Sequence, residues 1–167
     1  LAIDEITKDR GTLNPVIANR DVNKLIKDGV RITFTAGDES EDYIVKVIDF
    51  DNSENNEFYL ASQLWITGDL YKRRADLVGF INGLPLLFIE LKAVHKSVED
   101  AYNDNLRDYK STIPQLFWYN AIIILSNGSE SKVGSITSDF GHFSDWKKIN
   151  SEGETGVVSL DTIFKGV

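Results

Sequence analysis

The sequence predicts an α/β fold in which a mixed β-sheet is flanked by α-helices. Two stretches have the spacing of amphipathic helices, and short runs rich in β-branched and aromatic residues lie between and after them. One of these runs, Leu84 to Lys92, is apolar on both faces, which is typical of a central strand. The chain has 167 residues, 42% of them hydrophobic, so it is long enough to form one domain with a substantial core.

The first part of the chain predicts a helix followed by a β-hairpin. Pro15 to Lys27 has helical spacing, begins with a first-turn proline and ends before Gly29. Two alternating segments follow, Val30 to Thr35 and Tyr43 to Phe50, and the turn-forming pair Gly37-Asp38 separates them. We therefore expect these two segments to pair as antiparallel strands.

The central part of the chain predicts three further strands and a second helix. The strands are Phe58 to Thr67, Ala75 to Ile81 and Leu84 to Lys92. Ser97 is a good N-cap, and an apolar stripe with helical spacing follows it from Val98 to Lys110. The second helix is therefore expected directly after the central strand.

The last part of the chain predicts a final hairpin and an irregular tail. Ala121 to Leu125 has the composition of a buried strand and is followed by the turn pair Asn127-Gly128. Lys132 to Thr137 is the expected partner strand. The tail, which includes Trp146 and the glycine-rich residues 151–156, is expected to be mostly irregular.

Composition excludes several classes of protein. The chain has no cysteine, which excludes disulfides and thiolate metal sites. Its formal charge of −8 argues against a protein that coats nucleic acid in general. No run approaches the ~18 apolar residues of a membrane span, and no signal peptide opens the chain. We therefore expect a soluble protein without a membrane partner.

Two acids and a lysine form the candidate site. Asp76 lies on one predicted strand, and Glu90 and Lys92 end the next one. Because Glu90 and Lys92 are two residues apart, they point to the same side of the strand. Two carboxylates and a lysine are what metal-assisted hydrolysis of a phosphodiester requires. In this interpretation Asp76 and Glu90 bind Mg²⁺, and Lys92 orients the attacking water or stabilises charge on the phosphate.

A simpler interpretation exists for Glu90 and Lys92. The two side chains could form a surface ion pair, which contributes only ~0–1 kcal/mol to stability. Basic residues gather before Asp76 and after Glu90, and this favours the functional interpretation. These residues are Lys72, Arg73, Arg74, His95, Lys96, Arg107 and Lys110.

The turn between the two strands decides whether the acids can meet. A two-residue turn at Asn82-Gly83 with an unbroken ladder pairs Asp76 with Ile89, and the two carboxylates then lie on opposite faces. A three-residue loop puts Asp76 opposite Phe88, on the face of Glu90, and an equivalent β-bulge also restores the common face. We therefore predict an odd-length loop or a bulge.

The segments around these acids resemble the nuclease domain of the restriction (R) subunit of type I restriction-modification enzymes. The resemblance rests first on three segments, Arg73 to Val78, Phe80 to Leu86 and Ile89 to Lys92. Supporting stretches are Val47 to Asn52, Asn55-Asn56, Tyr109-Lys110, Ile113-Pro114, Phe117, Tyr119-Asn120 and Ser126 to Gly128. The acid followed by Glu-x-Lys is shared by the wider PD-(D/E)xK nuclease superfamily, whereas the Asn-Gly-Leu-Pro-Leu run is more specific.

The resemblance implies a restriction-endonuclease-like fold and a function. Residues 1–167 would be a single PD-(D/E)xK endonuclease domain, a fragment of a longer R subunit whose ATP-dependent translocase domains are absent. The activity would be Mg²⁺-dependent cleavage of double-stranded DNA, with ATP used by the full-length subunit and not bound by this fragment. Modification (M) and specificity (S) subunits would be partners, in a bacterial or archaeal cytoplasm.

The resemblance also assigns roles to residues. Asp76, Glu90 and Lys92 would be the cleavage residues, with Asp76 and Glu90 as metal ligands. A Gln-x-x-x-Tyr motif of the family falls on Asn105 and Tyr109, where asparagine is one methylene shorter than glutamine. At i and i+4 on a helix the two side chains share a face and could reach a DNA phosphate or brace Lys92. Tyr109 also belongs to the apolar stripe, so packing explains it as well.

Two other functions are compatible with the same residues. One is a repair or recombination nuclease of the same superfamily. The other is a non-catalytic module that keeps the nuclease scaffold and docks a motor or partner subunit.

Overall fold

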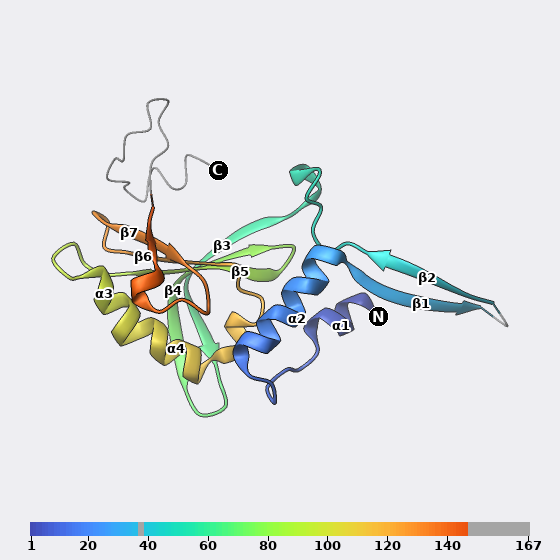
Figure 1. The fold of residues 1–167 in the computed structure, drawn as a ribbon, viewed down its shortest axis with the longest axis horizontal. Helices are drawn as coiled ribbons and strands as arrows, with labels where there is room; N and C mark the ends of the chain where they lie inside the picture. Colours follow the sequence, from blue (N-terminus) through green and yellow to red (C-terminus); the bar gives the residue numbers. More distant parts are fainter. Residues whose placement is uncertain (37–38, 147–167) are drawn as a thin grey trace.

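A computed structural model describes residues 1–36 and 39–146 and confirms the predicted α/β fold. A six-stranded sheet has the order β3-β4-β5-β6-β7-β8, and a separate two-stranded sheet, β1-β2, forms an arm that extends away from it (Figure 1). The strands are β1 (Val30–Ala36), β2 (Glu39–Val45), β3 (Phe58–Thr67), β4 (Lys72–Ile81), β5 (Leu84–Leu91), β6 (Ile122–Ser126), β7 (Ser131–Gly134) and β8 (Ser144–Asp145). The sheet is mixed because β5 and β6 are parallel and the other neighbours are antiparallel.

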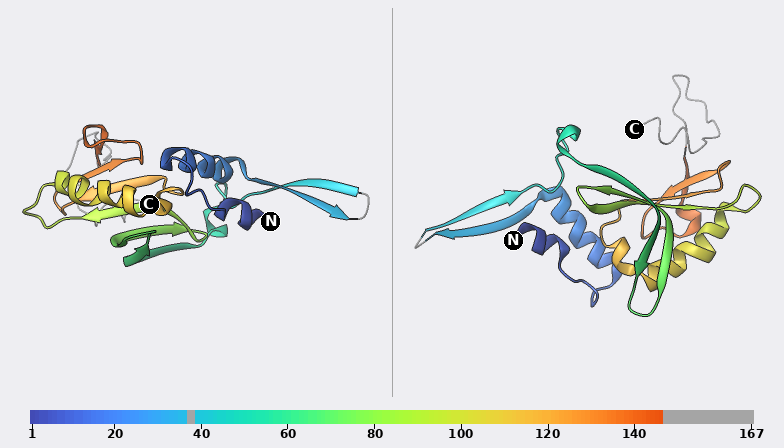
Figure 2. Two further views of the ribbon diagram at one scale, coloured as in Figure 1. Left: turned by 90° about the horizontal axis from the view of Figure 1, so that it is seen from below. Right: turned by 180° about the vertical axis from the view of Figure 1, so that it is seen from behind.

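The helices lie beside the sheet and at the base of the arm (Figures 1 and 2). They are α1 (Ala2–Thr7), α2 (Pro15–Asp28), α3 (Val98–Asp100), the π-helical η2 (Ala101–Leu106) and α4 (Arg107–Thr112), with 3-10 turns η1 (Ser53–Asn55), η3 (Pro114–Phe117) and η4 (Phe140–His142). The last three helical segments before η3 follow one another without a gap and form the predicted second helix. Short α1 was not predicted because six residues give too little periodicity to detect. No helix in the described ranges is long and apolar enough to cross a membrane.

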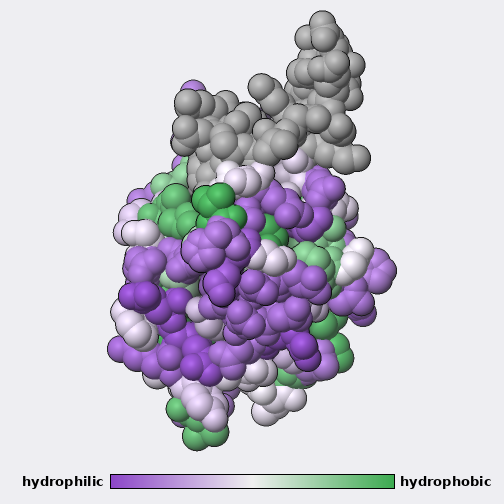
Figure 3. Space-filling model, turned by 90° about the vertical axis from the view of Figure 1, so that its left-hand side faces the viewer, coloured by the Kyte–Doolittle hydropathy of each residue, from purple (hydrophilic) through white to green (hydrophobic). Residues whose placement is uncertain are grey.

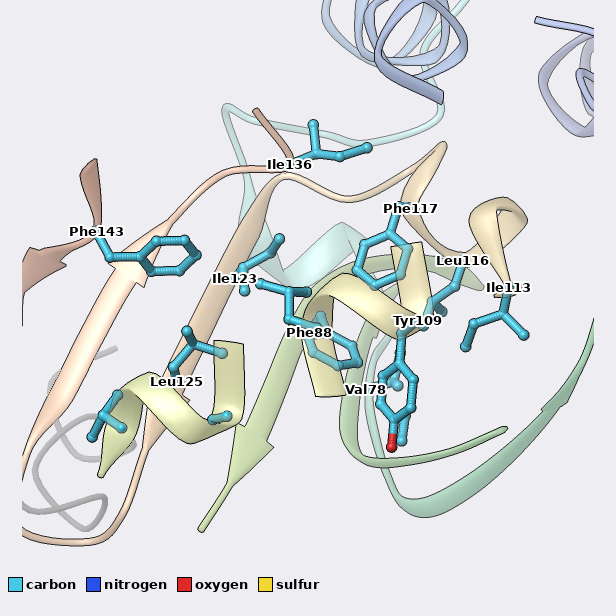
Figure 4. Packing of buried hydrophobic residues seen from close by; sticks show 14 residues of the cluster. Val78, Phe88, Tyr109, Ile113, Leu116, Phe117, Ile123, Leu125, Ile136 and Phe143 are labelled. Carbon is cyan, nitrogen blue, oxygen red and sulfur yellow. The ribbon is translucent and has the colours of Figure 1, made fainter. Parts of the chain in front are cut away.

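The main core lies between the sheet and the α3–η2–α4 helix. Phe88 of β5 is at its centre, with ring centroids 6.0 Å from Tyr109 and 5.3 Å from Phe117 (Figure 4). Ile123 and Leu125 of β6 are fully buried beside it. Burial of these large apolar side chains fixes the helix against β5, and so fixes the residues that follow Phe88 on that strand.

The predicted second strand of the first hairpin was wrong in its position. Strand β2 begins at Glu39 and ends at Val45, whereas Tyr43 to Phe50 was predicted. Pairing ends at Val45 because its partner, Val30, is the first residue of β1 and directly follows the end of α2 at Gly29. Beyond it the Asp49 carboxylate accepts hydrogen bonds from the main-chain N–H groups of Asp51 and Asn52, which shape a turn there. The predicted turn at 37–38 and the tail segment 151–156 lie outside the described residues.

The last hairpin also differs in detail from the prediction. Ser126 pairs with Ser131, so four residues rather than Asn127-Gly128 alone form the loop. The Asn127 side-chain oxygen accepts hydrogen bonds from the N–H groups of Ser129 and Glu130 and closes this wider turn. Strand β7 consequently starts one residue earlier than expected and ends at Gly134.

The turn between β4 and β5 has two residues and is followed by a β-bulge. Ile81 pairs with Leu84, while Asn82 (φ 50°) and Gly83 (φ 81°) take the left-handed conformation of a tight hairpin turn. Phe80 pairs with Pro85 but Gly79 pairs with Leu87, so one residue of β5 is extra. The predicted three-residue loop is therefore wrong, and the predicted alternative of an equivalent bulge is confirmed.

Asn82 fastens this turn to the preceding loop. Its side chain donates to the Val47 carbonyl (2.8 Å) and to Asn56 Oδ1 (2.9 Å) and accepts from the Glu57 N–H (2.7 Å). Asn82→Ala removes these bonds and leaves a Cβ in the left-handed region, so we expect a loss of about 2 kcal/mol in unfolding free energy. Urea denaturation measures it, and Asn82→Gly, which relieves only the backbone, should recover part of the loss. Equal midpoints for wild type and Asn82→Ala would contradict this role.

Candidate active site

The bulge brings Asp76 and Glu90 to the same face of the sheet. After the bulge Val78 pairs with Phe88 and Leu77 with Ile89, and continuing this register places Asp76 directly across from Glu90. Directly opposed residues on antiparallel strands share a face. Asp76 Oδ2 also accepts a hydrogen bond of 2.9 Å from the Leu91 N–H. Asp76, on β4, is thus held beside the end of β5. The three-residue loop would have placed it opposite Phe88, whereas the register of the structure places it opposite Glu90, two residues further along β5.

Glu90 is buried at this end of β5. Its exposed fraction is 2%, and within the described residues its Oε2 atom has no hydrogen-bond partner. Burial, and then the charge of Asp76, raise the pKa of Glu90 to about 8, although Lys92 acts in the opposite direction. The interpretation of Glu90 and Lys92 as a surface ion pair is therefore wrong for Glu90. A cation bound next to both carboxyl groups would favour the ionised form of Glu90 and so lower this pKa.

Lys92 lies beside the acids and is held by the following helix. Its Nζ donates to Asn105 Oδ1 at 2.6 Å and lies 3.6 Å from the exposed carboxylate of Asp104. Both partners belong to the π-helical η2, a wider turn of the kind that often occurs at functional sites. Although asparagine is shorter than glutamine, Asn105 reaches Lys92 and braces it.

Tyr109 connects the helix to the strand that carries Asp76. Its hydroxyl donates to the Arg74 carbonyl at 2.9 Å and accepts from Asn105 Nδ2 at 3.4 Å. The ring is buried in the core with only its hydroxyl at the margin (Figure 4), and burial raises the pKa of this tyrosine. Asn105 and Tyr109 therefore form a chain of contacts that links Lys92 to β4.

The surface at this end of the molecule is largely hydrophilic (Figure 3). The three basic residues that precede Asp76 divide into two groups. Arg73 forms an ion pair with Asp108 at 2.8 Å and ties β4 to α4. Lys72 and Arg74 lie over the exposed ring of Trp65, 5.3 and 5.7 Å from its centroid. Only the second group leaves its charge on the surface next to Asp76 in the sequence.

Gln63 is a neighbour of the site that the sequence did not reveal. Its Nε2 lies 3.4 Å from Asp76 Oδ1, and its φ is +54° in the middle of strand β3. A left-handed residue within a run of strand-forming residues leaves no signal in the amino-acid pattern.

The donor set fits an oxygen-preferring cation. Among residues 1–36 and 39–146 no cluster of three or more His, Cys, Asp or Glu side chains could hold a metal ion, and the candidate site offers two carboxyl groups, those of Asp76 and Glu90. The unpartnered, buried Oε2 of Glu90 is the observation that favours a ligand role. Mg²⁺ binds through one or two carboxylates and retains several waters, which suits two acids at a strand end.

A family model and individual relatives both relate this chain to type I restriction enzymes. Residues 1–142 match the family described as type I restriction enzyme R protein N terminus. The chain is 35% identical to the type I restriction enzyme HindI endonuclease subunit of Haemophilus influenzae over 96% of its own length and 16% of that protein. It is 37% identical to the putative MjaIXP endonuclease subunit of Methanocaldococcus jannaschii over 83% of its length and 14% of that protein. The chain thus spans about a sixth of these relatives.

Proposed function

The chain belongs to the family of type I restriction enzyme R protein N termini, and from this premise we propose that it is the module of such a subunit that hydrolyses phosphodiester bonds of double-stranded DNA. The observation that carries the proposal is the meeting of Asp76 with buried Glu90 at the end of β5, with Lys92 beside them. The family relationship supports a nuclease, and this arrangement supports the assignment of these three residues to its active site.

The three residues would have different roles in hydrolysis. Asp76 and Glu90 would hold Mg²⁺, which when bound polarises the phosphate and lowers the pKa of an attacking water. Lys92 presents a positive charge that Asn105 keeps in place, and this charge stabilises the phosphate oxygens as negative charge builds on them. The Leu91 N–H holds the Asp76 carboxylate next to β5, and the Tyr109 hydroxyl ties the helix to β4 at Arg74.

The rest of the proposed function lies outside this chain. Relatives about six times longer have room for the ATP-driven translocase, and ATP would be used there and not by this fragment. The M and S subunits of the complex would supply modification and sequence recognition. The net charge of −8 fits this division, because a domain that receives DNA from a motor does not need high affinity of its own.

Replacement of Lys92 tests the proposal. In the full-length subunit assembled with its M and S subunits, Lys92→Ala should lower DNA cleavage about 100-fold and leave ATP hydrolysis unchanged, because one charge-stabilising donor is lost. Lys24→Ala, at an exposed lysine of α2, is the matched control and should cleave normally.

The same assay separates the other candidate functions. Cleavage that requires ATP and the assembled complex favours the restriction enzyme over a repair or recombination nuclease. If Lys92→Ala cleaves as fast as the wild type, the site is not the one proposed, and a non-catalytic docking module becomes the better interpretation.

A further inference from the structure

Gln63 has an unusual backbone conformation at a position facing the candidate site. On β3 and β4, Ser62 pairs with Leu77 and Leu64 with Ala75, so Gln63 lies across from Asp76. Its φ of +54° is left-handed, and the only other non-glycine residue with positive φ in the described chain is Asn82, in the tight turn. A side chain with a Cβ is disfavoured there, and a strained residue beside a candidate site invites a functional explanation.

The backbone conformation alone has a structural explanation. In β4 both Ala75 and Val78 are buried in the main core although they are three residues apart, and in a regular strand they would face opposite sides. The strand pair therefore changes the face it presents to the core between Ala75 and Val78, in the region of β4 that Gln63 lies across from. Such a change needs an irregular backbone, and glycine would supply it without strain. It does not explain why the residue is a glutamine.

The side-chain contact supplies that explanation. Gln63 Nε2 donates to Asp76 Oδ1 at 3.4 Å, while the Leu91 N–H donates to Oδ2 at 2.9 Å. The two oxygens of the Asp76 carboxylate thus accept hydrogen bonds from the two neighbouring strands, one from β3 and one from β5. A carboxylate that accepts hydrogen bonds at both oxygens cannot rotate freely about its Cβ–Cγ bond, so its lone pairs keep one orientation.

We propose that Gln63 is a positioning residue, which holds the Asp76 carboxylate in the orientation that binds the divalent cation. The proposal rests on the proposed function, because it assumes that Asp76 is a metal ligand. Partners that orient metal ligands influence affinity although they do not touch the ion. In this arrangement the strained backbone at Gln63 brings the amide within reach of Asp76.

Metal binding and stability separate this role from a structural one. Mg²⁺ is titrated into this chain, and the rise in unfolding temperature gives its apparent affinity. Gln63→Gly should bind Mg²⁺ about tenfold more weakly than the wild type, yet its unfolding temperature in EDTA should be unchanged or higher, because glycine removes the left-handed strain. Gln63→Leu keeps the bulk without the amide and should show the same loss of affinity.

Ser62→Gly is the matched control, since it adds a glycine to the neighbouring exposed position of β3. It should lower the unfolding temperature and leave the Mg²⁺ affinity unchanged. Wild-type affinity in both Gln63→Gly and Gln63→Leu would overturn the role of Gln63 while leaving the proposed function intact. A wild type whose unfolding temperature does not respond to Mg²⁺ would overturn the metal site itself, and the role of Gln63 with it.

Discussion

Asp76→Asn in the full-length subunit is expected to reduce DNA cleavage by at least about 1,000-fold, because in the proposed function it removes a metal ligand and with it several kcal/mol of transition-state stabilisation. Asparagine keeps the size of the side chain and an oxygen that can accept from the Leu91 N–H. The fold should therefore be retained, and the loss can be attributed to the carboxylate charge. Plasmid cleavage by the complete M, R and S complex, with ATP hydrolysis recorded in parallel, measures the effect.

Asp69→Asn provides the control for this experiment. Asp69 is exposed on the loop that joins β3 to β4, so its replacement makes the same chemical change in the hairpin loop and not within the strand that carries Asp76. We expect normal cleavage and normal ATP hydrolysis from this variant. Cleavage by Asp76→Asn at more than a tenth of the wild-type rate, with ATP hydrolysis intact, would remove Asp76 from the site.

Glu90→Gln is expected to stabilise the metal-free chain, and increasingly so at higher pH. In the wild type the pKa of Glu90 rises from 4.5 to about 8 on folding. The folded state therefore holds this proton more tightly, and the stability present below pH 4.5 is lost as the pH rises toward 8. Over the 2.5 units between 4.5 and 7 the loss is about 3 kcal/mol, at 1.36 kcal/mol per unit. Glutamine does not titrate, so the variant does not lose this stability as the pH rises.

Urea denaturation in EDTA between pH 5 and pH 8.5 measures this difference. The unfolding free energy of Glu90→Gln should exceed that of the wild type by an amount that grows across this range and then levels off. Saturating Mg²⁺ should stabilise the wild type and have little effect on the variant. Glu57→Gln, at an exposed position, should keep the pH dependence of the wild type. Parallel wild-type and Glu90→Gln profiles would show that Glu90 titrates normally.

Much of the fold follows from local sequence pattern. The helix from Pro15 was predicted to within one residue of its end, and strand β3 agrees at both ends. These elements have caps, first-turn proline or regular alternation, which act over a few residues and are visible in the chain. The prediction for β2 was wrong because the length of its partner decides where pairing ends: β1 begins at Val30, so β2 ends at Val45, and the composition of residues 46–50 does not reveal this.

Part of the candidate site also follows from the sequence, and part depends on the tertiary structure. Asp76, Glu90 and Lys92 stand out in the sequence because charges at the end of an apolar strand are rare. The spacing from Asn105 to Tyr109 showed only that the two side chains share a helix face. The contact between Asn105 and Lys92 depends on how the helix packs against the sheet, which the sequence does not reveal. Gln63 had no signal at all, because its contact with Asp76 depends on strand pairing and on a left-handed backbone.

The amino-acid sequence by itself determined the chemistry available to this protein: an acid, a glutamate and a lysine beside a buried strand, in a chain without cysteine. It also showed that the acids could meet only if the ladder between them was irregular. Only the tertiary structure decided that the irregularity is a bulge in β5, between Pro85 and Leu87, and not a longer turn. The reason is that strand register depends on which side chains the rest of the fold buries, as with Phe88 beneath Tyr109 and Phe117, and this is not a local property.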